Sequence, residues 1–155
     1  MVIAAALAFC AMSAGAAERF TLTRLGEEII DTKQKLSFKR CPEYQAWQVN
    51  QCIGTRPDYT FTLALERAKQ VADESGLAWR LPTQKELQGL FEITAEKTTL
   101  ASKLFPLDAQ GTFWTSSKIS SYPDSIWTVK FNSGDLGEAS KSKSVYPVRL
   151  VRSLN

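Results

Sequence analysis

Apolar and polar residues alternate along the first part of the chain, with the period of two that predicts half-buried β-strands. The alternation covers residues 20–25, 28–31 and 35–39, with a turn at residues 32–34. Residues 40–58 are largely polar and show no such period, so we expect a long loop there, with Trp47 near its middle.

The period changes to that of a helix after this loop. Residues 59–75 place apolar side chains at helical spacing, namely Phe61, Ala64, Leu65, Ala68, Val71 and Ala72. Thr60 or Thr62 can cap the start of this helix, and Gly76 stands where a left-handed C-terminal cap is expected.

A short extended piece at residues 79–82 precedes a second predicted helix, and Pro82 fixes the break. Thr83 and Glu86 have the spacing of a capping box, in which each side chain bonds the backbone amide of the other residue. Leu87, Leu90 and Phe91 supply the apolar stripe, and we expect this helix to end near Thr94.

The last third of the chain returns to alternation. After a connection at residues 95–112, we expect strands at residues 113–116, 125–131, 136–139 and 145–151. Trp127, Val129 and Phe131 fall on one face of the second of these strands. The order of strands, two helices and an antiparallel meander indicates an α+β fold.

Residues 1–17 are apolar and end in small side chains, with Ala14 and Ala16 at the spacing that signal peptidase requires. This pattern predicts a signal peptide, a single domain at residues 18–155 and an extracytoplasmic location. No Lys or Arg precedes the apolar run, so either the true start lies upstream or the peptide is atypical. A buried N-terminal helix is the alternative, and Phe9 before Cys10 disfavours a lipoprotein signal.

Cys41 and Cys52 remain as an even pair once the signal peptide is removed. In an oxidising compartment we expect them to form a disulfide, worth roughly 2–3 kcal/mol by restricting the unfolded chain. A zinc site is the rival interpretation, but two cysteines in a chain without histidine supply too few ligands. We therefore expect no metal and no cofactor.

The formal net charge is +3, and the excess lies in residues 111–155, which hold six basic and three acidic side chains. This charge is too small for nucleic-acid binding but suits acidic partners such as anionic glycans or lipids. An ordinary solvated surface rich in lysine explains the same pattern. The candidate ligand-binding residues are the lysines of this region and two aromatic residues expected in loops: Lys118, Lys130, Lys141, Lys143, Trp47 and Tyr122.

Residues suited to catalysis are scarce. The chain contains no histidine and no glycine-rich phosphate loop. The neighbouring carboxylates at Glu27 and Glu28, and at Asp73 and Glu74, point in different directions on a strand or helix. We therefore expect a non-enzymatic protein, with a glycosidase built on distant carboxylates as the alternative that remains.

The chain resembles a domain family of unknown function typified by the C-terminal domain of a bacterial collagen-like adhesin, whose members look like distant relatives of C-type lectins and sulfatase-modifying factors. The similarity covers about residues 26–153. Its pieces are the strand pair running into Arg40-Cys41, Cys52-Ile53-Gly54, Tyr59-Thr60-Phe61, Trp79-Arg80-Leu81-Pro82-Thr83 with Lys85-Glu86-Leu87, Phe113-Trp114-Thr115-Ser116-Ser117, Trp127-Thr128-Val129-Lys130-Phe131 and Tyr146-Pro147-Val148-Arg149-Leu150-Val151-Arg152.

This resemblance implies a C-type-lectin-like fold, with an antiparallel sheet, two helices, long loops and one disulfide. For the adhesin type it also implies trimerisation and binding of sulfated glycosaminoglycans. The chain lacks a collagen repeat and the sugar motifs of calcium-dependent lectins, which Tyr122-Pro123-Asp124 only partly matches. We expect a structural role for the motif residues, with apolar side chains in the core and Arg80 in an ion pair: Trp79, Arg80, Leu81, Pro82, Trp114, Trp127 and Arg149.

Two function hypotheses follow. In the first, the chain is an adhesin-like module that binds acidic glycans on a surface through its lysines. In the second, it is a structural subunit of an extracellular surface or pilus-like assembly, in which long loops dock on a surface protein or on further copies of the chain.

Overall fold

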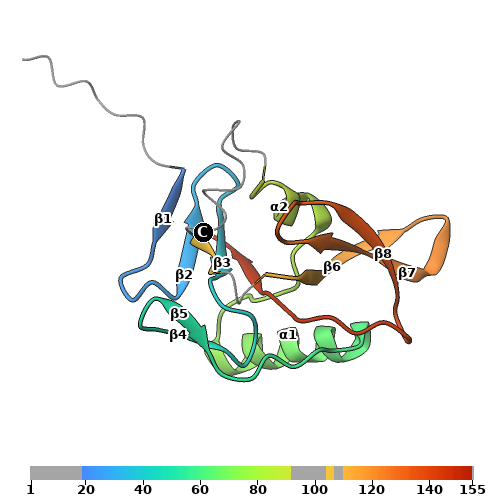
Figure 1. Cartoon of the computed structure of the whole chain (residues 1–155), viewed down its shortest axis with the longest axis horizontal. Helices are drawn as coiled ribbons and strands as arrows, with labels where there is room; N and C mark the ends of the chain where they lie inside the picture. Colours follow the sequence, from blue (N-terminus) through green and yellow to red (C-terminus); the bar gives the residue numbers. More distant parts are fainter. Residues whose placement is uncertain (1–18, 92–103, 107–109, 155) are drawn as a thin grey trace, which may run out of the picture.

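The computed structural model describes residues 19–91, 104–106 and 110–154. Within these ranges the chain forms antiparallel sheets and two helices (Figure 1), which confirms the α+β class. The predicted signal peptide and most of the connection at residues 95–112 lie outside the described residues. The elements are β1 (Phe20–Leu22), β2 (Glu28–Asp31), β3 (Leu36–Lys39), β4 (Ala46–Gln48), β5 (Gln51–Ile53), α1 (Phe61–Ser75), α2 (Gln84–Gln88), β6 (Thr112–Ile119), β7 (Tyr122–Lys130), β8 (Leu136–Ser140) and β9 (Val151–Ser153).

The strands form a four-stranded sheet in the order β1-β2-β3-β9, a small hairpin of β4 and β5, and a meander of β6, β7 and β8. The prediction of a strand at residues 145–151 is wrong in its bounds and in the sheet that the strand joins. Only its end is a strand, and Phe38 of β3 pairs with Val151. Pro147 has no amide hydrogen to donate to a sheet, and Tyr146 makes only an isolated bridge with Tyr59.

The loop expected at residues 40–58 contains the hairpin of β4 and β5, so that part of the prediction is wrong. The strands have three residues each and expose Ala46, Gln48, Gln51 and Ile53, which leaves no apolar alternation to detect. The disulfide between Cys41 and Cys52 is confirmed, with 5.5 Å between the Cα atoms. It ties the hairpin to the end of β3.

Helix α1 buries Phe61, Ala64, Ala68 and Val71 and ends at Gly76, whose φ of 67° confirms the left-handed cap. Thr60 occupies the N-cap position, but its side chain forms no capping hydrogen bond. The apolar stripe was predicted too wide, because Leu65 is 45% exposed. Leu65 lies at the edge of the stripe, which turns it away from the sheet.

Helix α2 has the predicted capping box, in which Thr83 accepts a hydrogen bond from the Glu86 amide and Glu86 accepts one from the Thr83 amide. The helix ends at Gln88 and not near Thr94, because Gly89 follows and the chain enters turns. No helix in the described part of the chain is long and apolar enough to span a membrane.

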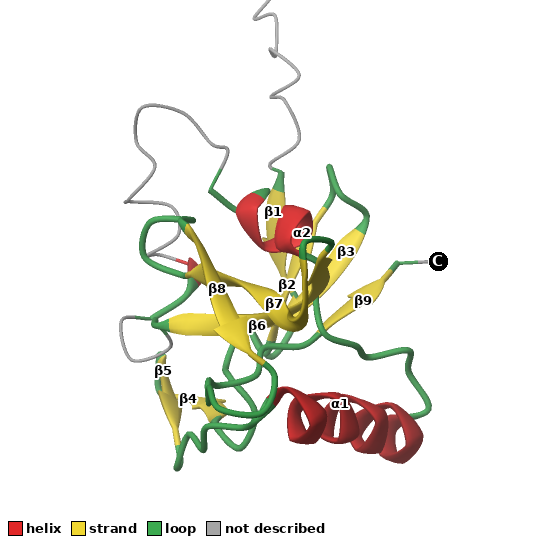
Figure 2. Cartoon of the chain, turned by 90° about the vertical axis from the view of Figure 1, so that its right-hand side faces the viewer, coloured by secondary structure: helices red, strands yellow, loops and turns green. Residues whose placement is uncertain are grey.

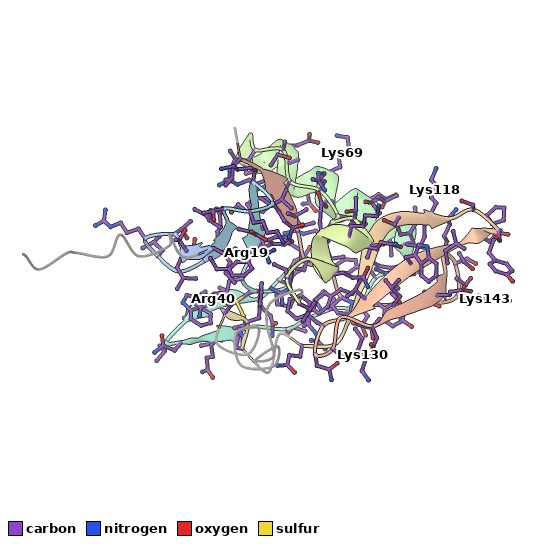
Figure 3. All side chains as sticks on the ribbon, turned by 90° about the horizontal axis from the view of Figure 1, so that it is seen from above. Arg19, Arg40, Lys69, Lys118, Lys130 and Lys143 are labelled. Carbon is purple, nitrogen blue, oxygen red and sulfur yellow. A yellow bond between two sulfur atoms is a disulfide. The ribbon has the colours of Figure 1, made fainter. Side chains whose placement is uncertain are left out.

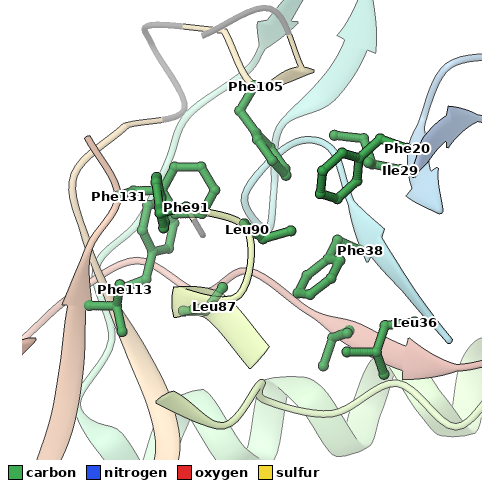
Figure 4. Close-up of a cluster of buried hydrophobic side chains, with 12 residues drawn as sticks. Phe20, Ile29, Leu36, Phe38, Leu87, Leu90, Phe91, Phe105, Phe113 and Phe131 are labelled. Carbon is green, nitrogen blue, oxygen red and sulfur yellow. The ribbon is translucent and has the colours of Figure 1, made fainter. Parts of the chain in front are cut away.

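The meander separates two apolar clusters, with α2 on one side and α1 on the other (Figure 2). On the α2 side, Phe113, Val129 and Phe131 pack against side chains of the four-stranded sheet (Figure 4). On the α1 side, Trp114 is fully buried beside Phe61, and its indole nitrogen donates to the carbonyl oxygen of Tyr59 at 2.7 Å.

Arg149 lies fully buried between the four-stranded sheet and the meander. Its guanidinium lies 4.8, 5.0 and 4.7 Å from the ring centroids of Phe105, Phe113 and Phe131. It also donates hydrogen bonds to the carbonyl oxygens of the last residue of β3 and of the next residue. The positive charge is thus held by aromatic faces and carbonyl dipoles.

Candidate functional site

An open cleft of about 400 Å³ lies between the start of α2 and the hairpin of β6 and β7. Residues from these three elements line this Trp127 cleft: Thr83, Gln84, Lys85, Ser117, Lys118 and Trp127. Aromatic, hydroxyl, amide and ammonium groups therefore face one opening, so the cleft combines a ring surface with hydrogen-bond donors and acceptors.

The α2 wall of the cleft is held by an ion pair behind it. Arg80 donates to both carboxylate oxygens of Glu86, at 2.8 and 2.7 Å, and Glu86 also accepts from the Thr83 amide at 2.7 Å. Burial raises the pKa of Glu86, but the bonds from Arg80 and from the Thr83 backbone outweigh burial and hold it below the ordinary value. The charge of Arg80 is therefore compensated inside the wall.

The opposite wall is formed by an irregular stretch of β6. Trp114 pairs with Thr128 of β7, whereas Lys118 pairs with Ile126, so β6 carries extra residues between them. The Thr115 hydroxyl donates to the Trp127 carbonyl oxygen at 2.6 Å. This β-bulge breaks the regular pairing beside the cleft.

The bulge frees polar groups of β6 to bind the start of α2. The Ser116 amide donates to the Pro82 carbonyl oxygen at 2.8 Å, and the Gln84 amide donates to the Ser117 hydroxyl at 3.0 Å. Two segments that the sequence analysis singled out, residues 79–83 and 113–117, thus meet at this wall. Their contact fixes the width of the cleft and leaves Lys118 at its rim.

Trp127 lies on the same face of β7 as Val129 but is only partly buried. The expectation that it fills the core is therefore met only in part. Helix α2 has five residues and covers Val129 without covering all of Trp127. The indole ring consequently offers part of its surface to the cleft.

The charged groups around the indole ring are unevenly placed. Lys85 and Lys118 are exposed, and neither forms an ion pair with a described residue. Glu138 of β8 is the direct cross-strand partner of Trp127, so its side chain stands on the same face of the sheet. The cleft therefore favours an anionic group on its lysine side and opposes one near Glu138.

A comparison with protein families matches residues 27–152 to the family described as the Lcl C-terminal domain. The chain belongs to this family. The matched range includes both cysteines and every residue that lines the Trp127 cleft. A comparison with curated proteins finds no significant match.

In this Lcl C-terminal domain the four predicted lysines do not form one patch. Figure 3 shows Lys118, Lys130 and Lys143 at separate places around the meander. Lys130 pairs with Thr112 at the far end of β7, and the Lys141 ammonium bonds the Pro123 carbonyl oxygen. The structure thus brings only Lys118 of this set to the cleft.

The two predicted aromatic residues also lie away from the cleft. Trp47 is partly buried on β4, where the Arg40 guanidinium lies 3.5 Å from the centroid of its ring. Tyr122 is 58% exposed at the start of β7. Arg40 thus occupies one face of the Trp47 ring, and Tyr122 presents an open surface next to the turn.

Lys85, Gln84 and Ser117 were not among the predicted ligand contacts. A signal was present for the first two, because Gln84 and Lys85 lie between Thr83 and Glu86 of the capping box and therefore had to lie in the first turn of a helix. Within the described ranges no three side chains of His, Cys, Asp or Glu come together to hold a metal ion.

Proposed function

We propose that this Lcl C-terminal domain is an exported, non-catalytic binding module that recognises acidic glycans on a surface. The observation that carries the proposal is the partly exposed Trp127 ring, flanked by Lys85 and Lys118 in one cleft. The C–H face of a sugar packs on an indole ring, and ammonium groups pair with sulfate or carboxylate groups. Hydroxyl and amide groups of the same cleft supply directional hydrogen bonds.

An extracytoplasmic location supports this function. The disulfide between Cys41 and Cys52 persists in oxidising compartments and is rare in the cytosol. The antiparallel meander, two helices and single disulfide are compatible with a C-type-lectin-like fold and with a relationship to collagen-like adhesins. We therefore propose this fold and this relationship for the chain.

A binding role without catalysis is supported by how the least exposed carboxylates are used. Asp31 is paired with Arg19, Glu43 with Lys39 and Arg67, and Glu86 with Arg80. These carboxylates therefore serve in ion pairs that stabilise the fold. A general acid requires a carboxyl group that keeps its proton near neutral pH, whereas the pKa values of Asp31 and Glu86 are lowered by their partners despite burial.

The test is retention on immobilised heparin across a series of NaCl concentrations. We expect retention at low salt that weakens steeply as salt rises. Changing Lys85→Gln together with Lys118→Gln should weaken heparin binding by about tenfold, because two charge-assisted contacts are lost. The matched control, Lys130→Gln with Lys143→Gln, removes the same charge outside the cleft.

A small effect of the control pair and a large effect of the cleft pair support the proposal. Equal losses of heparin affinity for the two pairs would show that binding depends on the overall charge and not on the cleft. Absence of retention by the unchanged protein at low salt would reject acidic-glycan binding.

A structural subunit of a surface or pilus-like assembly is the second candidate. It is favoured by two apolar side chains at turns, Leu25 and Val49, which are 72% and 88% exposed. Association with copies of the chain or with a surface protein would cover them. A native mass of several chains that falls to one chain with Leu25→Ser and Val49→Ser would support this candidate.

A further inference from the structure

A second pocket, of about 360 Å³, lies between the exposed side of α1 and the segment enclosed by the disulfide. Its lining combines two tyrosine rings with apolar and polar side chains of α1: Tyr44, Tyr59, Leu63, Glu66, Arg67 and Gln70. This Tyr44 pocket shares no residue with the Trp127 cleft.

Tyr44 stands on a closely packed backbone, and Arg67 lies against its ring. It is 59% exposed and has a φ of 63°, a left-handed conformation that is uncommon outside glycine. Gly54 packs against its backbone so closely that a Cβ at Gly54 would lie 2.6 Å from the Tyr44 carbonyl oxygen. The Arg67 guanidinium lies 4.5 Å from the ring centroid of Tyr44 and supports the ring from one side.

The charged groups around the pocket balance, which favours a neutral ligand. Arg67 donates to one carboxylate oxygen of Glu43 at 2.9 Å, and Lys39 donates to the other at 2.8 Å. Arg67 and Lys39 therefore share the single charge of this buried carboxylate. Glu66 is exposed and forms no ion pair with a described residue, so it supplies the second negative charge at the opening.

Hydrogen-bonding groups in the pocket suit a ligand rich in hydroxyls. The Tyr59 hydroxyl is buried and has no hydrogen-bond partner among the described residues. Burial raises the pKa of Tyr59 to about 12, so its hydroxyl keeps its proton and can donate. On α1, Glu66 and Gln70 stand four residues apart on the same face of the helix. The Gln70 amide accepts from Arg67 at 3.0 Å and donates to Glu74 at 2.8 Å, which leaves its second lone pair and its second N–H for a ligand.

We propose that the Tyr44 pocket binds a neutral sugar ring. The C–H face of the ring packs on Tyr44 and Leu63, and its hydroxyls bond Glu66 and Gln70. A sugar oxygen that reaches the Tyr59 hydroxyl supplies the partner that this buried donor lacks among the described residues. This inference is independent of the acidic-glycan function.

The test is a nuclear magnetic resonance titration of the full chain with a panel of neutral methyl hexopyranosides. Titration in about 0.5 M NaCl screens the lysines of the Trp127 cleft. We expect saturable shifts of the Tyr44 and Tyr59 resonances, with dissociation constants on the order of 1 mM for a single sugar ring. Tyr59→Phe removes one hydroxyl and should weaken binding by about fivefold.

Tyr44→Asn should abolish saturable binding, and asparagine tolerates the left-handed backbone at this position. Tyr122→Asn is the matched control, since Tyr122 is 58% exposed and Tyr44 is 59% exposed. The inference is overturned if no sugar of the panel shifts these resonances, or if both variants bind sugar equally well. Heparin retention of the Tyr44→Asn protein should stay unchanged, so failure of this inference and failure of the proposed function are distinguishable.

Discussion

The guanidinium of Arg149 donates a hydrogen bond of 2.8 Å to the carbonyl oxygen of Lys39, a residue that precedes it by 110 positions. Arg149 also donates to the Arg40 carbonyl, one residue before the disulfide at Cys41. A single buried side chain thus joins the segment before β9 to the chain that leaves β3.

Replacing this arginine should therefore destabilise the fold strongly. Arg149→Ala leaves two carbonyl groups without their donor and opens a cavity among three phenylalanine rings, so we expect a loss of about 3–5 kcal/mol. Urea unfolding under non-reducing conditions measures the loss. Arg24→Ala is the control, because Arg24 is exposed, and its effect should stay within about 0.5 kcal/mol.

Removing the acidic neighbour of Trp127 should strengthen acidic-glycan binding. Glu138 is the cross-strand partner of Trp127, and Glu138→Gln removes the repulsion that it exerts on an anionic ligand. We expect heparin affinity to rise by about threefold at low salt, as measured by the salt needed for elution. Asp124→Asn removes the same charge from an exposed site outside the cleft. A gain of equal size in that control would show that heparin affinity depends on the overall charge of the protein and not on the charge beside Trp127.

The ion pair behind the cleft predicts a stability that falls in acid. The pKa of Glu86 is lowered from its ordinary value of 4.5, so unfolding takes up a proton at this site. The stabilisation is fully present above about pH 4.5 and is lost as the pH falls through the lower value of the folded state. Unfolding free energies of the protein and of Glu86→Gln should converge as the pH falls below 4.5. A difference between the two unfolding free energies that stays constant across this pH range would contradict the assignment of this stabilisation to the ionised Glu86.

The turn between β4 and β5 predicts a stabilising substitution. Val49 and Asn50 have φ values of 47° and 62°, the conformation of a type I′ turn. A β-branched residue is strained there, so Val49→Asn should stabilise the protein by about 1 kcal/mol. Thermal unfolding measures the gain. Val145→Asn replaces another exposed valine, at a position without positive φ, and should produce no gain.

Local signals predicted much of the fold. The strand at residues 28–31, the capping box at Thr83 and the cap at Gly76 all depend on neighbours within a few positions. The hairpin of β4 and β5 escaped detection because a disulfide and tertiary packing stabilise strands whose own side chains carry no apolar pattern. The placement of β9 against β3 depends on a contact between distant segments, which periodicity cannot encode.

The candidate site was predicted in part, and for a similar reason. Lys118 was identified by its charge, but its association with Lys85 arises from the bulge in β6 and the docking of Ser116 and Ser117 on α2. The alternation of β7 placed Trp127 on the core face. Because α2 has only five residues, part of the Trp127 ring remains uncovered.

The pairing of β9 with β3 also shapes how the protein is made. The strand β3 lacks one of its two neighbours until residues 151–153 are available, so the four-stranded sheet cannot be completed before the meander has been synthesised. Because the contact joins segments that are distant in the chain, its loop-closure entropy is large, and we expect completion of this sheet to be a late and slow step of folding.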